Sequence, residues 1–400
     1  MHTGKGKGKT MKILSVTWTI HDERIKSYSS NFSGGGVVIK NLCEYLGEKE
    51  ESYLYLGQYD TPDLQLGNIN IVSNILQGNT YDNYSRVERL IIKFKQVLSE
   101  LSPDIVNVHG IGEMAIECIK VCKEYNIPCV FVEHLYIGLH KTFEKYDRDI
   151  LWEKELYNIP DLDIVAVSNG MRRKILRDYK DINKNNVHVI INGTNFSWQQ
   201  IHSDVREKYS LQKKKILLCV GTITQRKNQM QLVEAYKNLD YNLQENISVL
   251  FCGLDRMNSA LCEKIKAYGL DEKLIYVGTI DNDEMKKYYS VADGLIMPSL
   301  AEGLSIAALE AISYGLPVIM FSDLECADDL NDPKVVSFAE QRSDDALMHA
   351  IKKWYEKQWD SDYIKEYSGN FSIKTMGDEY IKINNNLLTN RKRTKNEVKI

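Results

Sequence analysis

Residues 294–311 read GLIMPSLAEGLSIAALEA, and this stretch decides the fold. The apolar run 294–297 predicts a buried strand, and the residues after it open into a helix made of small residues. A strand that leads directly into a helix is the building unit of a parallel sheet covered on both faces.

The same alternation extends along the whole chain. The first half predicts strands and helices at 12–18, 37–46, 105–108, 113–125, 129–132, 164–167 and 187–191. The pattern then restarts, with elements at 215–220, 230–237, 248–252, 261–268, 274–277, 294–297 and 317–321. A polar segment at 198–214 predicts a linker between them. We therefore expect two Rossmann-like βαβ domains whose parallel sheets face a central cleft, where open α/β sheets bind ligands.

Length and composition agree with this architecture. Four hundred residues suit two domains, and 43% hydrophobic with 26% charged residues is typical of soluble globular proteins. A net charge of -4 gives no reason to expect nucleic-acid binding. The eight scattered cysteines favour a reduced, cytoplasmic compartment. No apolar run is long enough to span a bilayer, so any membrane contact is expected to be peripheral, at its inner face.

The two ends of the chain differ in composition from the rest. Residues 1–10 are rich in glycine and lysine and are expected to form a disordered leader or tag-like segment. Residues 391–400 form a basic tail. Such a tail could touch anionic lipid or an acidic acceptor, but a solvated, frayed terminus is the commoner structure for it.

The residues of 302–310 suit a phosphate-bearing ligand. Gly303, Leu304 and Ser305 are expected at a helix N-terminus, where free N–H groups and the macrodipole attract phosphate. Glu302 would then face what the phosphate carries, and Glu310 would lie about two turns further along. A carboxylate there can accept hydrogen bonds from a diol such as ribose. An ordinary helix with an acidic first turn would explain the charges but not the glycine or the small residues.

This segment resembles the signature of the retaining glycosyltransferases of family four, which have the GT-B fold. Their motif has two glutamates separated by seven residues, with a glycine after the first. The resemblance implies that Glu302 binds hydroxyls of the donor sugar and Glu310 the ribose. It also implies that Gly303 and Leu304 offer amides to the diphosphate.

The segment 220–229, VGTITQRKNQ, follows a predicted strand and precedes a helix. Two cations at such a turn, Arg226 and Lys227, can neutralise a leaving diphosphate, although an exposed Arg-Lys pair is also common at helix starts. The segment resembles the family's phosphate-binding loop, in which the lysine binds donor phosphate. Thr222 is a departure, because many members carry arginine there. Gly253 and Thr279 end two further strands, and the resemblance implies that the nucleotide base lies against the second.

Matching features occur in the first half. Gly34, Gly35 and Gly36 are expected to form a loop just before a helix, which could admit a diphosphate or be a flexible turn. His109 and His134 each end a predicted strand. A lone histidine is usually structural, but two at neighbouring strand ends favour a site. The resemblance implies that His134 lies against the donor sugar and phosphate, that His109 has a less defined role, and that Asn192 belongs to the turn closing the N-terminal domain.

By the same resemblance, the N-terminal domain spans 11–196 with about 372–390, and the donor-binding domain spans 197–371. The last helix would cross back to the N-terminal domain. Acceptors would be held by the variable segments 24–33 and 136–157, which are rich in tyrosine and charge, as in Tyr28, Tyr136, His140, Lys141 and Arg148.

The resemblance thus implies a retaining, metal-independent hexosyltransferase. It would move a sugar from a nucleotide diphosphate sugar, with UDP-sugar favoured, to a hydroxyl of a carbohydrate, lipid-linked or polypeptide acceptor in bacterial surface glycan or glycoconjugate synthesis. No cofactor is expected, since the nucleotide sugar is a substrate. Two alternatives remain. One is a nucleotide-sugar epimerase, and the other is a catalytically weak partner subunit with the same fold, which Thr222 leaves open although the intact site residues argue against it. A dinucleotide-dependent oxidoreductase is disfavoured, because neither predicted domain has a G-x-G-x-x-G loop after its first strand.

Overall fold

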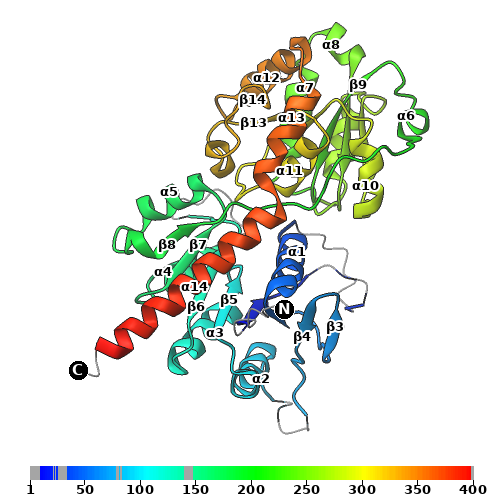
Figure 1. The fold of residues 1–400 in the computed structure, drawn as a ribbon. Coiled ribbons are helices and arrows are strands. Elements are labelled where there is room, and N and C mark those ends of the chain that lie inside the picture. The colour runs from blue at the N-terminus through cyan, green and yellow to red at the C-terminus, as the bar shows by residue number, and fades with distance from the viewer. Residues whose placement is uncertain are drawn as a thin grey trace, which may run out of the picture.

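The computed structural model describes residues 10–20, 22, 24–25, 34–77, 81, 83–138 and 147–397, with the backbone alone at 282 and 392–397. The first part of this chain forms a sheet with the strand order β3-β4-β2-β1-β5-β6-β7-β8 (Figure 1). Its strands are β1 (Lys12–Thr17), β2 (Glu51–Leu56), β3 (Leu64–Leu66), β4 (Ile69–Ile71), β5 (Ile105–His109), β6 (Cys129–Glu133), β7 (Asp163–Ala166) and β8 (Val187–Val189). The helices are α1 (Gly34–Lys49), α2 (Arg86–Leu101), α3 (Glu113–Glu124), α4 (Asp147–Tyr157) and α5 (Asn169–Asp178), with the short η3 (Lys184–Asn186).

The second part forms a sheet with the order β11-β10-β9-β12-β13-β14. Its strands are β9 (Lys215–Val220), β10 (Ile247–Cys252), β11 (Leu274–Gly278), β12 (Gly294–Met297), β13 (Val318–Phe321) and β14 (Val336–Ala339). The helices are α6 (Val205–Lys208), α7 (Gln229–Lys237), α8 (Tyr241–Asn246), α9 (Ala260–Ala267), α10 (Asn282–Tyr289), α11 (Ile306–Ser313), α12 (Asp344–Glu356), α13 (Ser361–Ser368) and α14 (Ile373–Glu397), with η4 (Glu325–Asp328) and η5 (Gly369–Phe371).

Helices cover both faces of the sheets, which explains why most of the inner strands of the second sheet are buried along their whole length. All six residues of β10 are buried, as are all four of β12 and of β13. A strand in a half-exposed sheet would alternate apolar with polar residues. The predicted parallel α/β architecture in two units is therefore confirmed.

The sequence patterns missed four strands, β2, β3, β4 and β14, and one change of direction. The change of direction is at the sheet edge, where β3 pairs antiparallel with β4. These two edge strands have three residues each and are joined by a turn at Gly67, whose φ is +57°. Strands this short carry too little periodicity to stand out in a sequence.

Each sheet has one point at which the strand order reverses. The second strand along the chain, β2, lies on one side of β1, and β5 lies on the other. In the second sheet, β10 and β12 flank β9 in the same way. The loops that leave strands on either side of such a point separate, and the space between them is where doubly wound sheets bind ligands.

The two crossings between the sheets are hydrogen-bonded to each other. Thr194 N donates to Phe371 O at 2.8 Å, and Ile373 N donates to Thr194 O at 3.3 Å. A Cβ at Gly193 would lie 2.3 Å from Ser372 O, so only glycine fits this approach. The crossings at 193–194 and 371–373 thus form a single hinge strip.

The last helix, α14, crosses back over the first sheet as predicted and runs along α1 in Figure 1. Tyr45 Oη of α1 donates to Asp378 Oδ1 of α14 at 2.6 Å, and Tyr380, also on α14, is buried. The expectation of a frayed basic tail is wrong for 391–397, because α14 continues to Glu397 and Arg391 Nη1 donates to Asn126 O at 2.7 Å. Residues 1–9 and 398–400 lie outside the described residues.

Candidate active site

A cavity of about 750 Å³ lies between the carboxyl ends of the two sheets. It opens at both reversal points, since its lining includes Trp18 after β1, Gly221 after β9 and Glu302 after β12. Among the predicted site residues, the following line it: Gly34, Gly35, His134, Asn192, Thr222, Arg226, Lys227, Gly253, Thr279, Glu302, Gly303, Leu304, Ser305 and Glu310. Gly36 and His109 do not line it.

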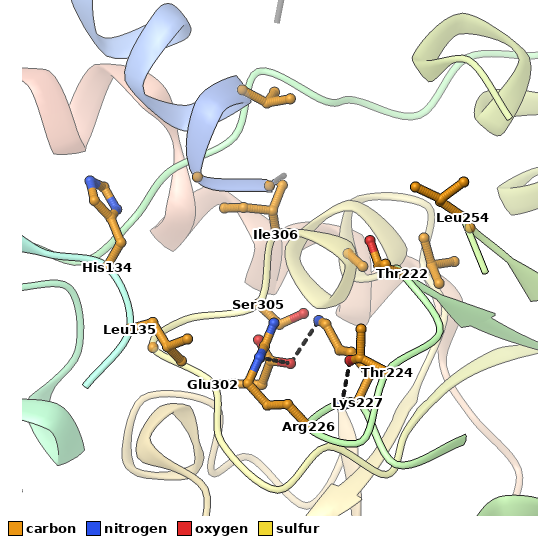
Figure 2. Close-up of a pocket in the computed structure, with 18 of the residues that line it drawn as sticks. His134, Leu135, Thr222, Thr224, Arg226, Lys227, Leu254, Glu302, Ser305 and Ile306 are labelled. Carbon is orange, nitrogen blue, oxygen red and sulfur yellow. Dashed lines mark hydrogen bonds and ion pairs between the residues drawn. The ribbon is translucent and has the colours of Figure 1, made fainter. Parts of the chain in front are cut away.

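Glu302 lies in contact with both predicted cations. Its Oε1 is 2.7 Å from Lys227 Nζ and 3.1 Å from Arg226 Nη1 (Figure 2). Burial of this 7%-exposed residue raises the carboxyl pKa, but the charges of Lys227 and Arg226 outweigh burial and lower the pKa to about 2. Glu302 is therefore an ionised carboxylate at neutral pH, which accepts hydrogen bonds and has no proton to give.

Backbone contacts fix the two loops that carry this cluster. Leu300 N donates to Arg226 O at 2.8 Å, and Arg226 Nη1 donates to Ala301 O at 2.7 Å. Asn228 has a left-handed backbone at φ +57°, and its side chain donates to Pro298 O at 3.1 Å. The loop after β9 is thus held against the loop after β12, so that Arg226 and Lys227 meet Glu302.

A glycine also lets the loop after β10 approach the loop after β9 closely. Gly253 has φ +153°, and a Cβ there would lie 2.2 Å from Gly221 O. Gly221 has φ +136° and lies beside the stem of Lys227. Both positions favour glycine because their φ is positive, and Gly253 also needs it because another backbone lies in contact. The loops after β9 and β10 consequently form one continuous wall of the cavity.

The helix after β12 begins later than the sequence suggested. Gly303 and Leu304 precede it, Ser305 is the N-cap residue, and α11 starts at Ile306. Gly303 is required for a different reason, since a Cβ there would lie 2.2 Å from His134 O of the first unit. The 303–305 turn is therefore one of the places where the two units touch.

Glu310 lies within α11 and lines the same cavity. Burial raises its carboxyl pKa to about 7, although the hydrogen bond from Tyr289 Oη at 2.9 Å opposes the rise. In contrast to Glu302, it has no cation within ion-pair distance among the described residues. The two glutamates thus differ in protonation at neutral pH.

The two histidines form a pair. His109 Nδ1 lies 3.1 Å from His134 Nε2, with the rings stacked at 5.4 Å. Burial lowers the pKa of His109 well below its usual value and that of His134 to about 4, so both rings are neutral at pH 7. Only His134 reaches the cavity, and its Nδ1 has no partner within the described residues. His109 therefore orients His134 from behind.

The glycine run does not form a loop. Gly34, Gly35 and Gly36 make the first turn of α1, so the expected position before the helix is wrong. Gly34 lies against Ile306, with a Cβ position 3.5 Å from the side chain, and Gly36 is buried. Three glycines in a row have no side chains that could show a helical period, so the sequence pattern could not place the start of this helix.

Glu325 is a buried residue that the sequence patterns missed. Its Oε2 accepts from Glu302 N at 3.0 Å, and its Oε1 pairs with Lys174 Nζ of the first unit at 2.7 Å. Nearby, Asp329 accepts from the backbone and side chain of Asn169, at 2.9 and 2.6 Å. Glu325 thus links the first unit to the backbone of Glu302, and no local motif distinguishes it from an ordinary surface glutamate.

The lining also includes residues that were not predicted, among them Trp18, Gln58 and Arg256. Trp18 is 44% exposed and lies against Gly57, where a Cβ would be 2.6 Å from the indole. The segments expected to hold the acceptor are only partly described. Tyr28, His140 and Lys141 lie outside the described residues, and Tyr136 is buried with its hydroxyl 2.8 Å from Asp178. Tyr136 is therefore a structural residue rather than an acceptor contact.

The described side chains include no group of three or more His, Cys, Asp or Glu residues arranged to hold a metal ion. No described helix has both the length and the apolar content needed to cross a membrane.

Comparison with protein families matches both halves of the chain. Residues 202–371 match the family Glycosyl transferases group 1, and residues 32–198 match Glycosyltransferase Family 4. Together the two matches span most of the chain, and they meet at the linker between the two sheets.

Individual relatives share low sequence identity with this chain. An uncharacterized 41.2 kDa protein in the cps region of Klebsiella pneumoniae is 24% identical over 369 residues, covering 87% of this chain and 96% of that protein. The GalNAc-alpha-(1->4)-GalNAc-alpha-(1->3)-diNAcBac-PP-undecaprenol alpha-1,4-N-acetyl-D-galactosaminyltransferase of Campylobacter jejuni is 24% identical, covering 62% of this chain and 64% of that protein. The crystal structure of Anabaena HepE with UDP and glucose has a TM-score of 0.71 at 13% identity, covering 93% and 99% of the two chains. The structural likeness confirms the fold.

Proposed function

Because this chain belongs to the group 1 and family four glycosyltransferases and has their GT-B fold, we propose that it transfers a sugar from a UDP-sugar to a hydroxyl acceptor with retention of configuration. The observation that carries the proposal is the contact of one ionised carboxylate, Glu302, with Arg226 and Lys227 at the reversal point of the second sheet. This places an acceptor of hydrogen bonds beside cations, as a sugar diphosphate requires.

The donor would lie along the second unit. Lys227 would bind the diphosphate and stabilise its charge as the glycosidic bond breaks, while the amides of 303–306 and the macrodipole of α11 add to that stabilisation. Glu302 would accept hydrogen bonds from the sugar hydroxyls, and Glu310 from the ribose. Arg226, whose guanidinium already bonds Ala301 O and Glu302, would position the carboxylate.

The first unit would contact the reacting sugar from the other side of the cavity. His134 is neutral and lines the cavity, and its Nδ1 has no hydrogen-bond partner among the described residues, so it can exchange a hydrogen bond with the sugar or its phosphate without adding charge. We propose departure and attack on the same face, with the leaving phosphate taking the proton of the acceptor hydroxyl. Metal independence is part of this proposal, because Arg226, Lys227 and the backbone amides would supply the positive charge.

The biological setting is proposed from the relatives. One relative is named for a cps region and another for an undecaprenol-linked glycan, both bacterial. We therefore propose a role in bacterial surface glycan or glycoconjugate synthesis. All eight cysteines are free thiols, which supports a cytoplasmic site of action.

The test is a screen of UDP-, GDP- and ADP-sugars for release of the nucleoside diphosphate, with and without sugar acceptors. Wild-type protein should turn over a UDP-sugar, and Glu302→Ala and Lys227→Ala should each lower the rate by about 100-fold or more. Lys266→Ala removes an exposed cation of α9 outside the cavity and serves as the control. Turnover by Lys227→Ala at the wild-type rate, in a folded variant, would refute the proposal.

A further inference from the structure

Arg256 adds a third cation to the cavity wall. It lies on the loop after β10, is exposed, and lines the cavity. Within the part of the chain that the structure describes, its guanidinium makes neither a hydrogen bond nor an ion pair. In this respect it differs from Arg226 and Lys227, which are both paired with Glu302.

The backbone pairs the segment that carries Arg256 with the segment that carries Thr222. Arg256 N donates to Ile223 O at 3.1 Å, and Ile223 N donates to Leu254 O at 2.8 Å. Residues 223 and 255 form a parallel bridge. This register sets Leu254 opposite Thr222 and Arg256 two residues further along. The side chain of Arg256 thus starts from the same wall as Thr222, the uncharged position where the resembled family often has arginine.

Arg226 is poorly placed to act in that position. Its Nη1 is 2.7 Å from Ala301 O and 3.1 Å from Glu302 Oε1, and its side chain is 19% exposed. Turning toward a ligand would break both contacts and leave Glu302 with one cation fewer. Within the described part of the chain, the Arg256 guanidinium has no hydrogen bond or ion pair to lose, and a guanidinium can bind two phosphate oxygens at once.

We infer that Arg256 binds the diphosphate of the nucleotide-sugar donor and supplies, from the loop after β10, the positive charge that Thr222 does not. The inference rests on the proposed function, since it needs a nucleoside diphosphate in the cavity. Arg256 would then reach the donor from the loop after β10, whereas Lys227 reaches it from the loop after β9.

Calorimetric titration tests this. The wild type is titrated with UDP, GDP and ADP, and the tightest ligand is then compared with its nucleoside, which lacks phosphate. Arg256→Ala should weaken binding of the diphosphate by about 10- to 100-fold and leave binding of the nucleoside unchanged. Lys266→Ala, the matched loss of one exposed charge, should bind both ligands as the wild type does. Adding Thr222→Arg to Arg256→Ala should restore most of the lost affinity.

The outcomes separate the two proposals. If the wild type binds no nucleoside diphosphate, the proposed function fails and the inference with it. If the wild type binds but Arg256→Ala binds equally well, the inference alone is overturned. Equal weakening of the diphosphate and the nucleoside would also overturn it, because the contact would then be to the base or ribose.

Discussion

Replacing Glu310 by glutamine should stabilise the ligand-free protein while weakening its binding of nucleotide. The carboxyl is buried in α11 with its pKa raised to about 7, and its hydrogen-bond partner is Tyr289 Oη. Glutamine keeps an acceptor for that hydroxyl and removes the ionisable group. The substitution therefore isolates the free energy that the folded protein loses by ionising a buried carboxyl.

The magnitude follows from the two pKa values. The ordinary value is 4.5 and the folded value is about 7, and each pKa unit corresponds to about 1.4 kcal/mol. A raised carboxyl pKa favours the folded state at low pH, and this contribution is lost as the pH rises from 4.5 through 7. Glu310→Gln escapes the loss, so its gain should be below about 1 kcal/mol at pH 5 and about 3 kcal/mol at pH 8.

Thermal unfolding of both proteins at pH 5, 6, 7 and 8 measures this gain. The Tm of Glu310→Gln should exceed that of the wild type by about 6 to 12 °C at pH 8, with the difference shrinking toward pH 5. Glu263→Gln changes an exposed carboxyl of α9 and is the control. UDP should raise the Tm of the wild type but have a smaller effect on Glu310→Gln, because an amide N–H₂ would face hydroxyls that donate. A Tm difference that does not change with pH would refute the reasoning.

Two other changes test the contacts between the units, and a third tests the wall of the first unit. Gly303→Ala puts a Cβ 2.2 Å from His134 O, so it should force the units apart and lower sugar transfer at least 10-fold while far-ultraviolet circular dichroism stays unchanged; wild-type transfer would contradict this. Gly193→Ala places a Cβ 2.3 Å from Ser372 O and should lower the Tm of the protein, whereas an unchanged Tm would mean that the hinge strip tolerates a side chain. Trp18→Ala removes an exposed ring from the wall of the first unit, so it should raise KM for a sugar acceptor several-fold and leave UDP affinity, measured by titration, as in the wild type.

The fold was largely predictable because the strands are apolar on both faces. The predicted runs at 215–220 and 294–297 coincide with β9 and β12. The edge strands β3 and β4 were missed because three residues show no period. The start of α1 was placed too late because glycine is a poor helix former.

The candidate site was predictable where a loop directly follows a strand. Glu302, Lys227 and His134 all gather at one cavity for that reason. Glu325 and Arg256 were not predicted, because their importance comes from contacts between loops that are far apart in the chain. The contact of Glu325 with Glu302 N spans 23 residues, and no local pattern encodes it.

Proton NMR of the first sugar released from a nucleotide sugar tests the central claim most directly. We predict that the protein turns over an α-linked UDP-sugar and that the first product, observed before the anomers equilibrate, is the α-anomer, which Lys227→Ala should release at least about 100-fold more slowly. A first product in the β-configuration would contradict retention, and the absence of turnover with every nucleotide sugar would contradict the assignment of this cavity as a donor site.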